Sequence, residues 1–595
     1  MRATLAILAL PLIAAALYAQ FAASASLANT ITNALVMVVM VTGLSIYVGN
    51  TGILSFAHPA FAGVAAFATA IGSLPVALKG SLLPNLPGGL SALALPPAVS
   101  GAVGVLVAGA AGAAVAPAIA RLGGAAAAIA TLGLLIIAHS LFVGGTTFTR
   151  GAQAIYAIPK VVTPVAAAGA AIAAVAAALW FKSSRWGLLA RAAREDEPAA
   201  RSVGVDVVRA RLVAFILSAM VVGLGGVLFA HHLGVISPRE FYFTLSFSLL
   251  TMLIVGGQGS VSGAVVGVAL ITVLIEVLRD LESGFALGPM EVPALFGLTT
   301  VGVSAALLLT LYLRSAGIFG NSEVHDLFPA REAGEPQSVV SGSAATAASG
   351  NTLEAENIVK RYGGHLALDG VSLTLGRGEI VGLIGSNGSG KTTLLSCLTG
   401  VQAFDGGSVR VGGEPYSGRP AMDFARAGVA RTFQNIRLFG SLSVRENIAA
   451  ALIASGAADR READRWLTRM RLCEVARRRA KTLAYGPQRR LEIARALATR
   501  PDFVLLDEPA AGMNAAETAT LLTMLADLRD RDGLGLLLVD HDLHLILSLC
   551  DRVIVLNEGK VIASGTPGDI RADDAVARAY FGQRRRQSAP APAAS

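Results

Sequence analysis

Nine apolar segments in this sequence are each long enough to cross about 30 Å of hydrocarbon as a helix. They lie near residues 4–24, 31–49, 57–78, 97–119, 123–143, 162–181, 212–230, 244–275 and 293–313. We therefore expect an α-helical polytopic membrane domain over residues 1–314, with eight to ten spans. The first segment follows Arg2 and is expected to be a retained helix. A cleaved signal peptide over residues 1–25 is the alternative.

Charged residues are distributed unevenly along the chain. Residues 1–314 hold 24 of the 88 charged residues, and the following 281 residues hold the other 64. This pattern excludes a single soluble domain and predicts a membrane domain followed by a soluble one. The net charge of +8 needs no nucleic-acid partner, because much of the basic charge of the first half lies in one loop beside apolar spans.

That basic loop orients the chain. Its basic residues are Lys182, Arg185, Arg191, Arg194, Arg201, Arg209 and Arg211. The positive-inside bias places such a loop on the cytoplasmic side. Residues 315–350 are rich in Ser, Ala and Gly and predict a flexible linker, so residues 351–583 form a cytoplasmic domain. The basic and then Ala/Pro-rich tail, residues 584–595, is expected to be disordered.

The second half has the pattern of an α/β domain. Short apolar runs at residues 380–384, 503–506 and 536–539 alternate with helical patterns, which predicts a largely parallel sheet. The first run leads into a P-loop pattern. Its residues are Gly385, Ser386, Asn387, Gly388, Ser389, Gly390, Lys391 and Thr392, followed by Thr393.

The P-loop residue types suit nucleotide binding. Glycines let backbone N–H groups close around phosphates at a helix N-terminus, Lys391 neutralises the β- and γ-phosphate oxygens, and the Thr392 hydroxyl can ligate Mg²⁺. A glycine-rich turn without a ligand is the alternative. At the end of the next apolar run, Asp507 can hold the metal shell and Glu508 can polarise a water molecule.

Residues 351–583 resemble the ATP-binding cassette of ABC transporters from end to end. The resemblance implies that Tyr362 stacks on adenine, and that Gln434 meets Mg²⁺ and the permease. It also implies that His541 contacts the γ-phosphate, with ATP and Mg²⁺ as cofactors. The soluble domain is thus expected to be a P-loop NTPase of the ABC type.

The signature segment of the cassette departs from the general family. It contains Ala484, Tyr485, Gly486, Pro487 and Gln488 where the family has a Leu-Ser-Gly-Gly-Gln core. Ala484 removes a hydroxyl donor to phosphate, which leaves backbone N–H groups at a helix N-terminus to bind it, and Pro487 has no N–H. The Ala-Tyr-Gly form, together with residues 509–514, resembles the cassettes of branched-chain amino-acid importers. Asn514 stands where most cassettes have an aspartate.

Residues 49–63 interrupt an apolar stretch with glycines, Pro59 and His58. Irregular backbone at membrane depth is tolerated where it is buried or lines a cavity, so this segment is a candidate for the substrate path. Close helix packing through glycine is the alternative. The segment resembles the Gly-x-x-Ser-x-Gly-His region of branched-chain amino-acid permeases. Residues 191–204 resemble the cytoplasmic coupling helix of such permeases, a solvated basic loop being the alternative.

These resemblances imply an ATP-driven importer subunit, with permease and ATPase fused, that moves branched-chain or related amino acids across the inner membrane into the cytoplasm. One such chain would be half a transporter. Its implied partners are a second permease, a second ABC ATPase, a periplasmic substrate-binding protein and membrane lipid, with no nucleic acid. The alternatives are import of urea or short amides, an exporter half-transporter, and a signalling switch that binds ATP without moving solute.

Overall fold

The computed structural model describes residues 2–283, 285–287, 290–292, 294–327, 351–457, 460–573 and 576. The chain divides into two compact units. The first contains residues 1–194 and 208–334, and the second contains residues 195–207 and 335–595. The short segment 195–207 falls within the predicted membrane domain but belongs to the second unit.

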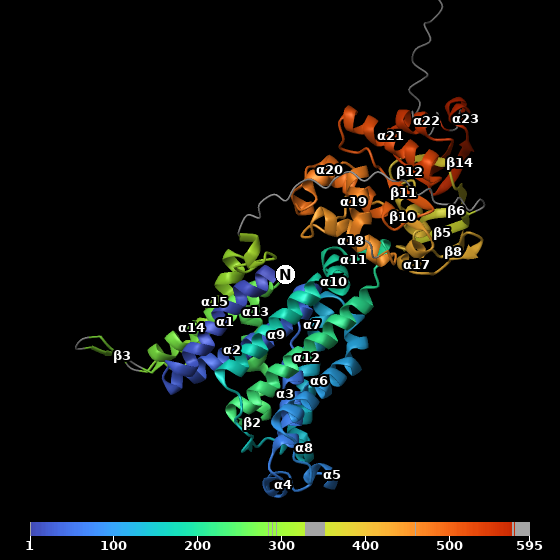
Figure 1. The fold of residues 1–595 in the computed structure, drawn as a ribbon. Coiled ribbons are helices and arrows are strands. Elements are labelled where there is room, and N and C mark those ends of the chain that lie inside the picture. Colours follow the sequence, from blue (N-terminus) through green and yellow to red (C-terminus); the bar gives the residue numbers. More distant parts are fainter. Residues whose placement is uncertain are drawn as a thin grey trace, which may run out of the picture. The chain divides into compact units, whose positions relative to one another are not determined.

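Seven helices of the described residues are long and apolar enough to cross a membrane (blue to green in Figure 1). They are α1 (Arg2–Phe21), α2 (Ala25–Thr51), α6 (Pro97–Ala120), α7 (Gly124–Gly144), α9 (Pro164–Ser183), α12 (Val207–Leu233) and α14 (Val261–Glu282). Two shorter apolar helices, α13 (Phe243–Gly256) and α15 (Leu298–Leu313), accompany them. The predicted eight to ten spans are reached only when these shorter helices are included.

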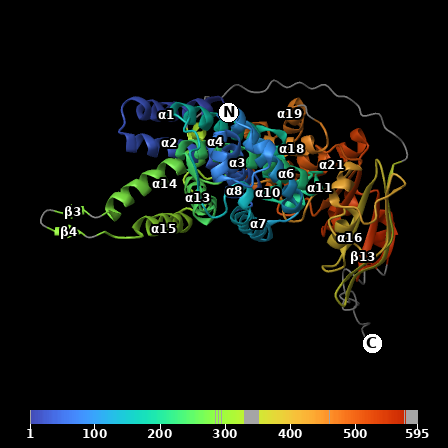
Figure 2. The same ribbon diagram turned by 90° about the horizontal axis from the view of Figure 1, so that it is seen from below.

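Short elements connect the long helices of the first unit. The helical ones are α3 (His58–Ser73), α4 (Val76–Leu82), α5 (Gly88–Ser91), α8 (Thr146–Thr149), α10 (Arg185–Glu195), η1 (Pro238–Phe241) and η2 (Val324–Leu327). Strands β1 (Ile155–Tyr156) and β2 (Val235–Ile236) pair antiparallel, as do β3 (Phe285–Leu287) and β4 (Met290–Val292). Helices α14 and α15 lie side by side and lead into the β3–β4 hairpin (Figure 2).

The core of the first unit depends on small residues that let helices approach closely. A Cβ atom at Gly226 of α12 would lie 2.1 Å from the carbonyl oxygen of Ala62 on α3. A Cβ at Gly104 of α6 would lie 2.7 Å from the carbonyl oxygen of Ala65. Helices in membranes associate through such small-residue contacts, because apolar burial alone does not favour protein over lipid. Helix α15 has no buried residue, which suits contact with lipid or another protein.

The sequence predicts a flexible linker from residue 315, but the first part of that segment is structured. Residues 315–327 are packed into the first unit, where the backbone N–H groups of Ile318 and Phe319 donate to the carbonyls of Val255 and Gly256. Glu323 is buried and forms an ion pair with Lys182, at 2.6 Å. This buried ion pair fixes residues 315–327 to the first unit, although their Ser- and Gly-rich composition predicts a flexible segment. The rest of the predicted linker, residues 328–350, lies outside the described residues.

The second unit contains two sheets. The six-stranded sheet has the order β10-β11-β12-β7-β13-β14, parallel except for β14, which pairs antiparallel with β13. Its strands are β10 (Val429–Arg431), β11 (Phe503–Asp507), β12 (Gly535–Val539), β7 (Ile380–Gly385), β13 (Arg552–Asn557) and β14 (Lys560–Gly565). Strands β7, β11 and β12 are wholly buried, as expected of parallel strands covered on both faces.

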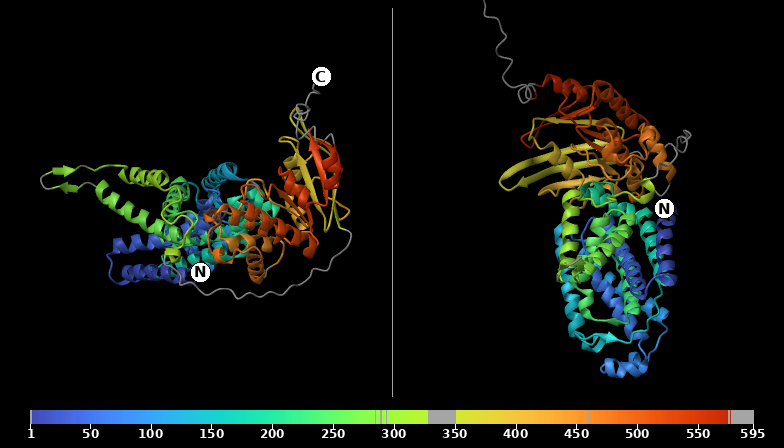
Figure 3. Two further views of the ribbon diagram at one scale, coloured as in Figure 1. Left: turned by 90° about the horizontal axis from the view of Figure 1, so that it is seen from above. Right: turned by 90° about the vertical axis from the view of Figure 1, so that its left-hand side faces the viewer.

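The second sheet is antiparallel with the order β6-β5-β8-β9. Its strands are β5 (Thr352–Tyr362), β6 (His365–Gly376), β8 (Gly406–Val411) and β9 (Glu414–Pro415). In Figure 3 its yellow strands lie beside the red strands of the six-stranded sheet, in agreement with the contacts of β6 with β12 and β14. The predicted α/β domain with a largely parallel sheet is confirmed.

Helices and short 3₁₀ turns complete the second unit. They are α11 (Glu197–Ser202), α16 (Lys391–Leu398), α17 (Ala421–Arg426), α18 (Val444–Ala454), α19 (Arg460–Arg469), η3 (Cys473–Val475), η4 (Ala480–Thr482), α20 (Tyr485–Leu497), α21 (Ala515–Asp532), α22 (Leu543–Leu549) and α23 (Pro567–Ala572). The predicted disordered tail, residues 584–595, lies outside the described residues.

Candidate functional site

The P-loop has the strand–loop–helix geometry that its motif predicts. Strand β7 ends at Gly385 and helix α16 begins at Lys391. Gly388 and Gly390 have φ angles of 83° and 101°, a region that favours glycine. A Cβ atom at Gly390 would also lie 2.6 Å from the carbonyl oxygen of Ala367. The loop therefore needs glycine for its backbone conformation as well as for space.

Lys391 lies against this loop and is only 9% exposed. Its Nζ donates to the carbonyl oxygens of Gly385 at 2.8 Å and Ser386 at 2.9 Å. Burial lowers the pKa of Lys391, and the nearby carboxylates of Glu508 and Asp507 act in the opposite direction. The ammonium group is thus held at the loop beside two carboxylates.

Asp507 ends strand β11 and is 1% exposed. Both of its carboxylate oxygens are buried and have no hydrogen-bond partner among the described residues. Burial raises the pKa of Asp507, while the Arg431 guanidinium acts to lower it. Buried polar atoms are normally paired, so an unpaired carboxylate at this position suits a cation.

The described residues contain no group of three or more His, Cys, Asp or Glu side chains placed to hold a metal ion. An ion at Asp507 would therefore take its other ligands from hydroxyl, amide, phosphate or water oxygens. These are the donors that Mg²⁺ commonly uses at nucleotide sites, so the residues present fit that ion.

Glu508 and His541 lie next to Asp507. The Nδ1 atom of His541 is 3.9 Å from Oε2 of Glu508 and 3.6 Å from Oδ1 of the buried Asp540. The backbone N–H of Glu508 donates to the carbonyl of Val539 at 2.8 Å. Glu508 has a φ angle of 44°, which costs energy for a residue with a side chain. The fold thus places a carboxylate and an imidazole beside the P-loop lysine.

Lys391, Asp507, Glu508 and His541 form one cluster, which we call the catalytic cluster after the catalytic role that the sequence predicts for Lys391, Glu508 and His541. No hydrogen bond or ion pair joins this cluster to Tyr362, Gln434 or residues 484–488 within the described part of the chain. Tyr362 ends β5, is 47% exposed and has the Lys360 Nζ 5.4 Å from its ring centre. Gln434, Thr392 and Thr393 are not buried. Their predicted contacts with nucleotide or Mg²⁺ remain predictions.

The signature segment forms the start of α20. Ala484 is the N-cap and makes no side-chain hydrogen bond, because it lacks the hydroxyl group that a serine would supply. The side chain of Gln488 donates to the carbonyl of Leu483 at 2.9 Å. A Cβ at Gly486 would lie 2.5 Å from Oε1 of Glu517. Gly486 therefore allows α21 to approach the start of α20.

Asn514 has a structural role that sequence reasoning missed. It caps α21, since its Oδ1 accepts from the Glu517 backbone N–H at 2.9 Å. The Glu517 side chain in turn accepts from the Asn514 N–H at 3.1 Å. This reciprocal capping is signalled by the sequence Asn514-Ala-Ala-Glu517.

Arg489 is a second residue that sequence reasoning missed. It is fully buried on α20 and pairs with Glu492 at 2.6 Å. Its guanidinium also donates to the carbonyl oxygens of Asp507 and Glu508, at 2.5 and 2.6 Å. Glu492 accepts from the Phe433 N–H at 3.2 Å. This pair joins the signature helix to the catalytic cluster and to the loop that carries Gln434.

The interrupted segment of the first unit is closely packed. His58 is fully buried, with Nδ1 2.8 Å from Ser55 Oγ and Nε2 2.7 Å from Ser218 Oγ. A Cβ at Gly49 would lie 2.6 Å from the Gln258 carbonyl oxygen, and one at Gly63 would lie 2.7 Å from the Phe142 ring. These contacts favour the packing alternative over an open substrate path.

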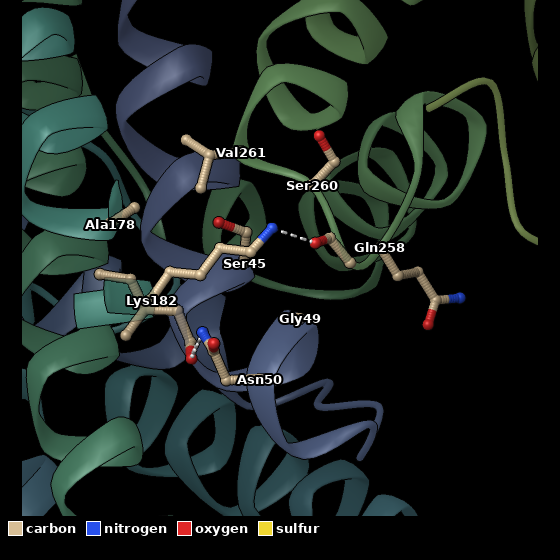
Figure 4. Close-up of a pocket in the computed structure, with 10 residues that line it drawn as sticks. Ser45, Gly49, Asn50, Ala178, Lys182, Gln258, Ser260 and Val261 are labelled. Atoms are coloured by element: carbon tan, nitrogen blue, oxygen red, sulfur yellow. Dashed lines mark hydrogen bonds between the residues drawn. The ribbon is translucent and has the colours of Figure 1, made fainter. Parts of the chain in front are cut away.

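A small cavity lies where α2, α9 and the loop after α13 meet (Figure 4). The Lys182 side chain points across it and donates to the Gly259 carbonyl at 2.7 Å. Its volume is about 10 Å³, close to that needed for one water molecule. On the other side of Lys182, Glu323 accepts from the backbone N–H of Ser262 at 2.9 Å. Burial alone would raise the pKa of Glu323, but Lys182 and Ser262 lower it.

Of the predicted coupling segment, residues 191–204, the part from residue 195 onward belongs to the second unit, together with residues 205–207. Glu195 accepts from the backbone N–H of Ser441 at 3.0 Å and from its hydroxyl at 2.6 Å. Asp196 caps α11 through the Ala199 N–H at 2.8 Å and lies 3.5 Å from Arg437. Ser441 and Arg437 follow Gln434 closely in sequence. The segment therefore contacts the loop region that contains Gln434.

Comparison with protein families defines the class of the chain. The family model "ABC transporter" matches residues 368–511. The model "branched-chain amino acid transport system / permease component" matches residues 26–315. A third model, "branched-chain amino acid ATP-binding cassette transporter", matches residues 560–585. The chain is a fusion of a helical permease with an ABC ATPase, whose ATP hydrolysis is coupled to transport.

Curated relatives agree with this class. The high-affinity branched-chain amino acid transport ATP-binding protein BraF of Pseudomonas aeruginosa is 43% identical over 249 residues, which is 39% of this chain and 98% of BraF. LivG of Escherichia coli K12, with the same description, is 42% identical over 251 residues, again 39% of this chain and 98% of the relative. A crystal structure of an ATP-binding cassette of an ABC transporter in its ADP conformation is 28% identical, with a TM-score of 0.36. It covers 39% of this chain and 99% of that one. The chain belongs to the branched-chain amino acid ABC transporter family.

Proposed function

We propose that this protein imports branched-chain or chemically related amino acids into the cytoplasm at the expense of ATP. One observation carries the proposal. A permease of the branched-chain amino acid type and a cassette similar to LivG and BraF occur in one chain. The cassette is also 37% identical to the lipopolysaccharide export ATP-binding protein LptB of Escherichia coli. The permease match therefore distinguishes an importer from an exporter.

The catalytic cluster supports a specific division of roles in ATP hydrolysis. The P-loop backbone and Lys391 would hold the β- and γ-phosphates, and Glu508 would orient and deprotonate the attacking water. His541 would contact the γ-phosphate. Mg²⁺, when bound, would neutralise charge on the phosphates. Asp507, Thr392 and Gln434 are the residues of this chain that would hold it.

One chain would supply half of the transporter. In the family, two cassettes enclose two ATP molecules between P-loop and signature segments of opposite subunits. Consistent with this, the signature segment of this chain makes no hydrogen bond or ion pair to its own catalytic cluster in the part of the chain that the structure describes. We infer a second permease, a second ABC ATPase and a periplasmic binding protein as partners, assembled in the inner membrane.

The coupling segment would carry cassette movement to the permease. Glu195 and Asp196 bind Ser441 and Arg437, and Arg489 and Glu492 bind the backbone beside Gln434. A movement at the γ-phosphate side of the site would thus be transmitted to residues 195–207 through a continuous series of hydrogen bonds and ion pairs. Replacing Glu195 with Gln should reduce uptake more than it reduces ATP hydrolysis.

The test is uptake of labelled leucine, with urea in parallel, by cells that carry this gene together with its neighbouring transporter genes. Cells with Lys391→Ala serve as the control. Leucine uptake that disappears in the control supports the proposal. Urea uptake alone would keep the mechanism and replace the substrate class. Uptake of neither would contradict import of either solute and favour the exporter or signalling alternatives.

A further inference from the structure

The first unit contains a cavity of about 610 Å³ that the catalytic and coupling residues do not touch. It lies among α2, α12, α13, α14 and the η1 turn, and its volume is in the range of pockets that take small molecules. Helices α2, α13 and α14 pack against one another beside it (Figure 1).

The cavity lies at the end of the first unit opposite its basic, cytoplasmic end. Helix α2 reaches that basic end at Gly49, whose carbonyl accepts from Arg194 at 2.6 Å. Asn33 of the cavity is sixteen residues earlier on the same helix, about 24 Å away along its axis. Helix α12 likewise enters the cavity only at its last turns, and α14 does so through Thr272–Arg279. By the positive-inside bias, the cavity is on the external side.

Charges of both signs line the cavity, namely Arg239, Arg279, Glu240 and Glu276. Both oxygens of Glu240 accept from Ser237, and Arg279 pairs with Glu276. The Arg239 guanidinium takes part in no hydrogen bond or ion pair within the described residues. Glu276 accepts from Thr30 at 3.1 Å and from Arg279 at 3.0 Å, in both cases through Oε1. Its Oε2 has no partner in the described part of the chain. A free cationic fork and a free carboxylate oxygen thus face one space.

The rest of the lining suits an apolar group between these charges. Met37 of α2, and Leu245 and Met252 of α13, supply apolar surface. Methionine adapts to ligands of different shape. Neutral amides such as urea carry no charge to pair with either group.

We propose that this cavity is an external binding site for a zwitterionic α-amino acid with an apolar side chain. Arg239 binds the α-carboxylate and Oε2 of Glu276 binds the α-ammonium group. This inference rests on the proposed function and deepens it, because it places substrate recognition in the permease as well as in a binding protein.

The experiment measures binding of labelled leucine to the purified full-length chain in detergent, without a binding protein. Leucinamide, which lacks the carboxylate, and 4-methylpentanoate, which lacks the ammonium group, are the competitors. We expect leucine to bind and each analogue to compete at least tenfold less well. Arg239→Gln should weaken leucine binding roughly ten- to a hundredfold and remove the preference over leucinamide. Glu276→Gln should remove the preference over 4-methylpentanoate.

Asp280→Asn is the matched control, one turn beyond Glu276 on α14, exposed, and outside the cavity lining. It should leave leucine affinity unchanged. Thermal unfolding of each variant in detergent, unchanged from wild type, verifies that its permease unit is folded. Absence of leucine binding to the wild-type chain, or equal affinity in Arg239→Gln and Asp280→Asn, overturns the proposal. The proposed function is judged separately, by uptake in cells, and stands if leucine is imported while this site fails.

Discussion

Glycine serves opposite purposes in the two units of this protein. In the cassette, Gly388 has a φ angle of 83° and no atom within 4 Å of the position a Cβ would take, so it shapes a loop around open space. In the permease, a Cβ at Gly226 would lie 2.1 Å from a neighbouring carbonyl oxygen, so glycine closes space between helices. A glycine-rich segment therefore indicates a binding site only when residues with suitable chemistry lie at fixed offsets from it.

The largest expected effect is in the cassette, where the open P-loop lies beside the catalytic cluster. Glu508→Gln keeps the size of the side chain but removes the base, so we expect ATP hydrolysis to fall about 10²- to 10⁴-fold with nucleotide retained. Phosphate release and bound nucleotide, measured on the same sample, test this. Lys391→Ala should instead abolish ATP binding. Normal turnover in Glu508→Gln would remove that carboxylate from the mechanism.

The second effect concerns the buried pair that supports the catalytic cluster. Arg489→Met leaves Glu492 buried without its cation, which should cost about 3–5 kcal/mol of stability. The matched control is Arg500→Met, because the Arg500–Glu462 pair is exposed on the arginine side and should contribute at most about 1 kcal/mol. Denaturant unfolding of the two variants measures the difference. Equal losses would contradict the role assigned to Arg489.

The third prediction concerns the glycines of the permease. Gly226→Ala forces a methyl group against the backbone of α3 and should destabilise the permease by about 1–3 kcal/mol. Gly169→Ala is the control, since Gly169 lies within α9 with nothing within 4 Å of its Cβ position. That change should stabilise the helix by about 0.5–1 kcal/mol. Thermal unfolding in detergent compares them. A Gly226→Ala protein as stable as wild type would show that the helices do not pack as described.

The smallest effect is expected at the signature segment. Ala484→Ser adds a hydroxyl at the N-cap of α20, but Pro487 at the third helical position has no N–H to donate to it. We therefore expect a gain of only about 0.5 kcal/mol in stability, at the low end for such caps, and no loss of ATPase activity. Thermal unfolding and phosphate release provide the readouts. Lower activity would mean that the ATP site requires alanine at this position.

Sequence alone was sufficient for the class, the two-part architecture and the parallel sheet, because each depends on local patterns of hydrophobicity, charge and motif spacing. It also identified Lys391, Asp507, Glu508 and His541, which the fold brings together. It did not identify Arg489 and Glu492, since the groups that they join to α20 are backbone groups far away in sequence. It placed the flexible linker too early because composition does not report that Glu323 pairs with Lys182. For the segment around His58 it left two alternatives, a substrate path and close helix packing. The contacts at Gly49 and Gly63 favour packing.

The most direct test of the central claim measures leucine uptake and ATP hydrolysis together. Proteoliposomes would contain this chain with its partner subunits, as wild type or as Glu508→Gln. We expect both activities to occur together in the wild type and both to be lost in the variant. Leucine uptake that persists in Glu508→Gln would contradict ATP-driven import by this protein.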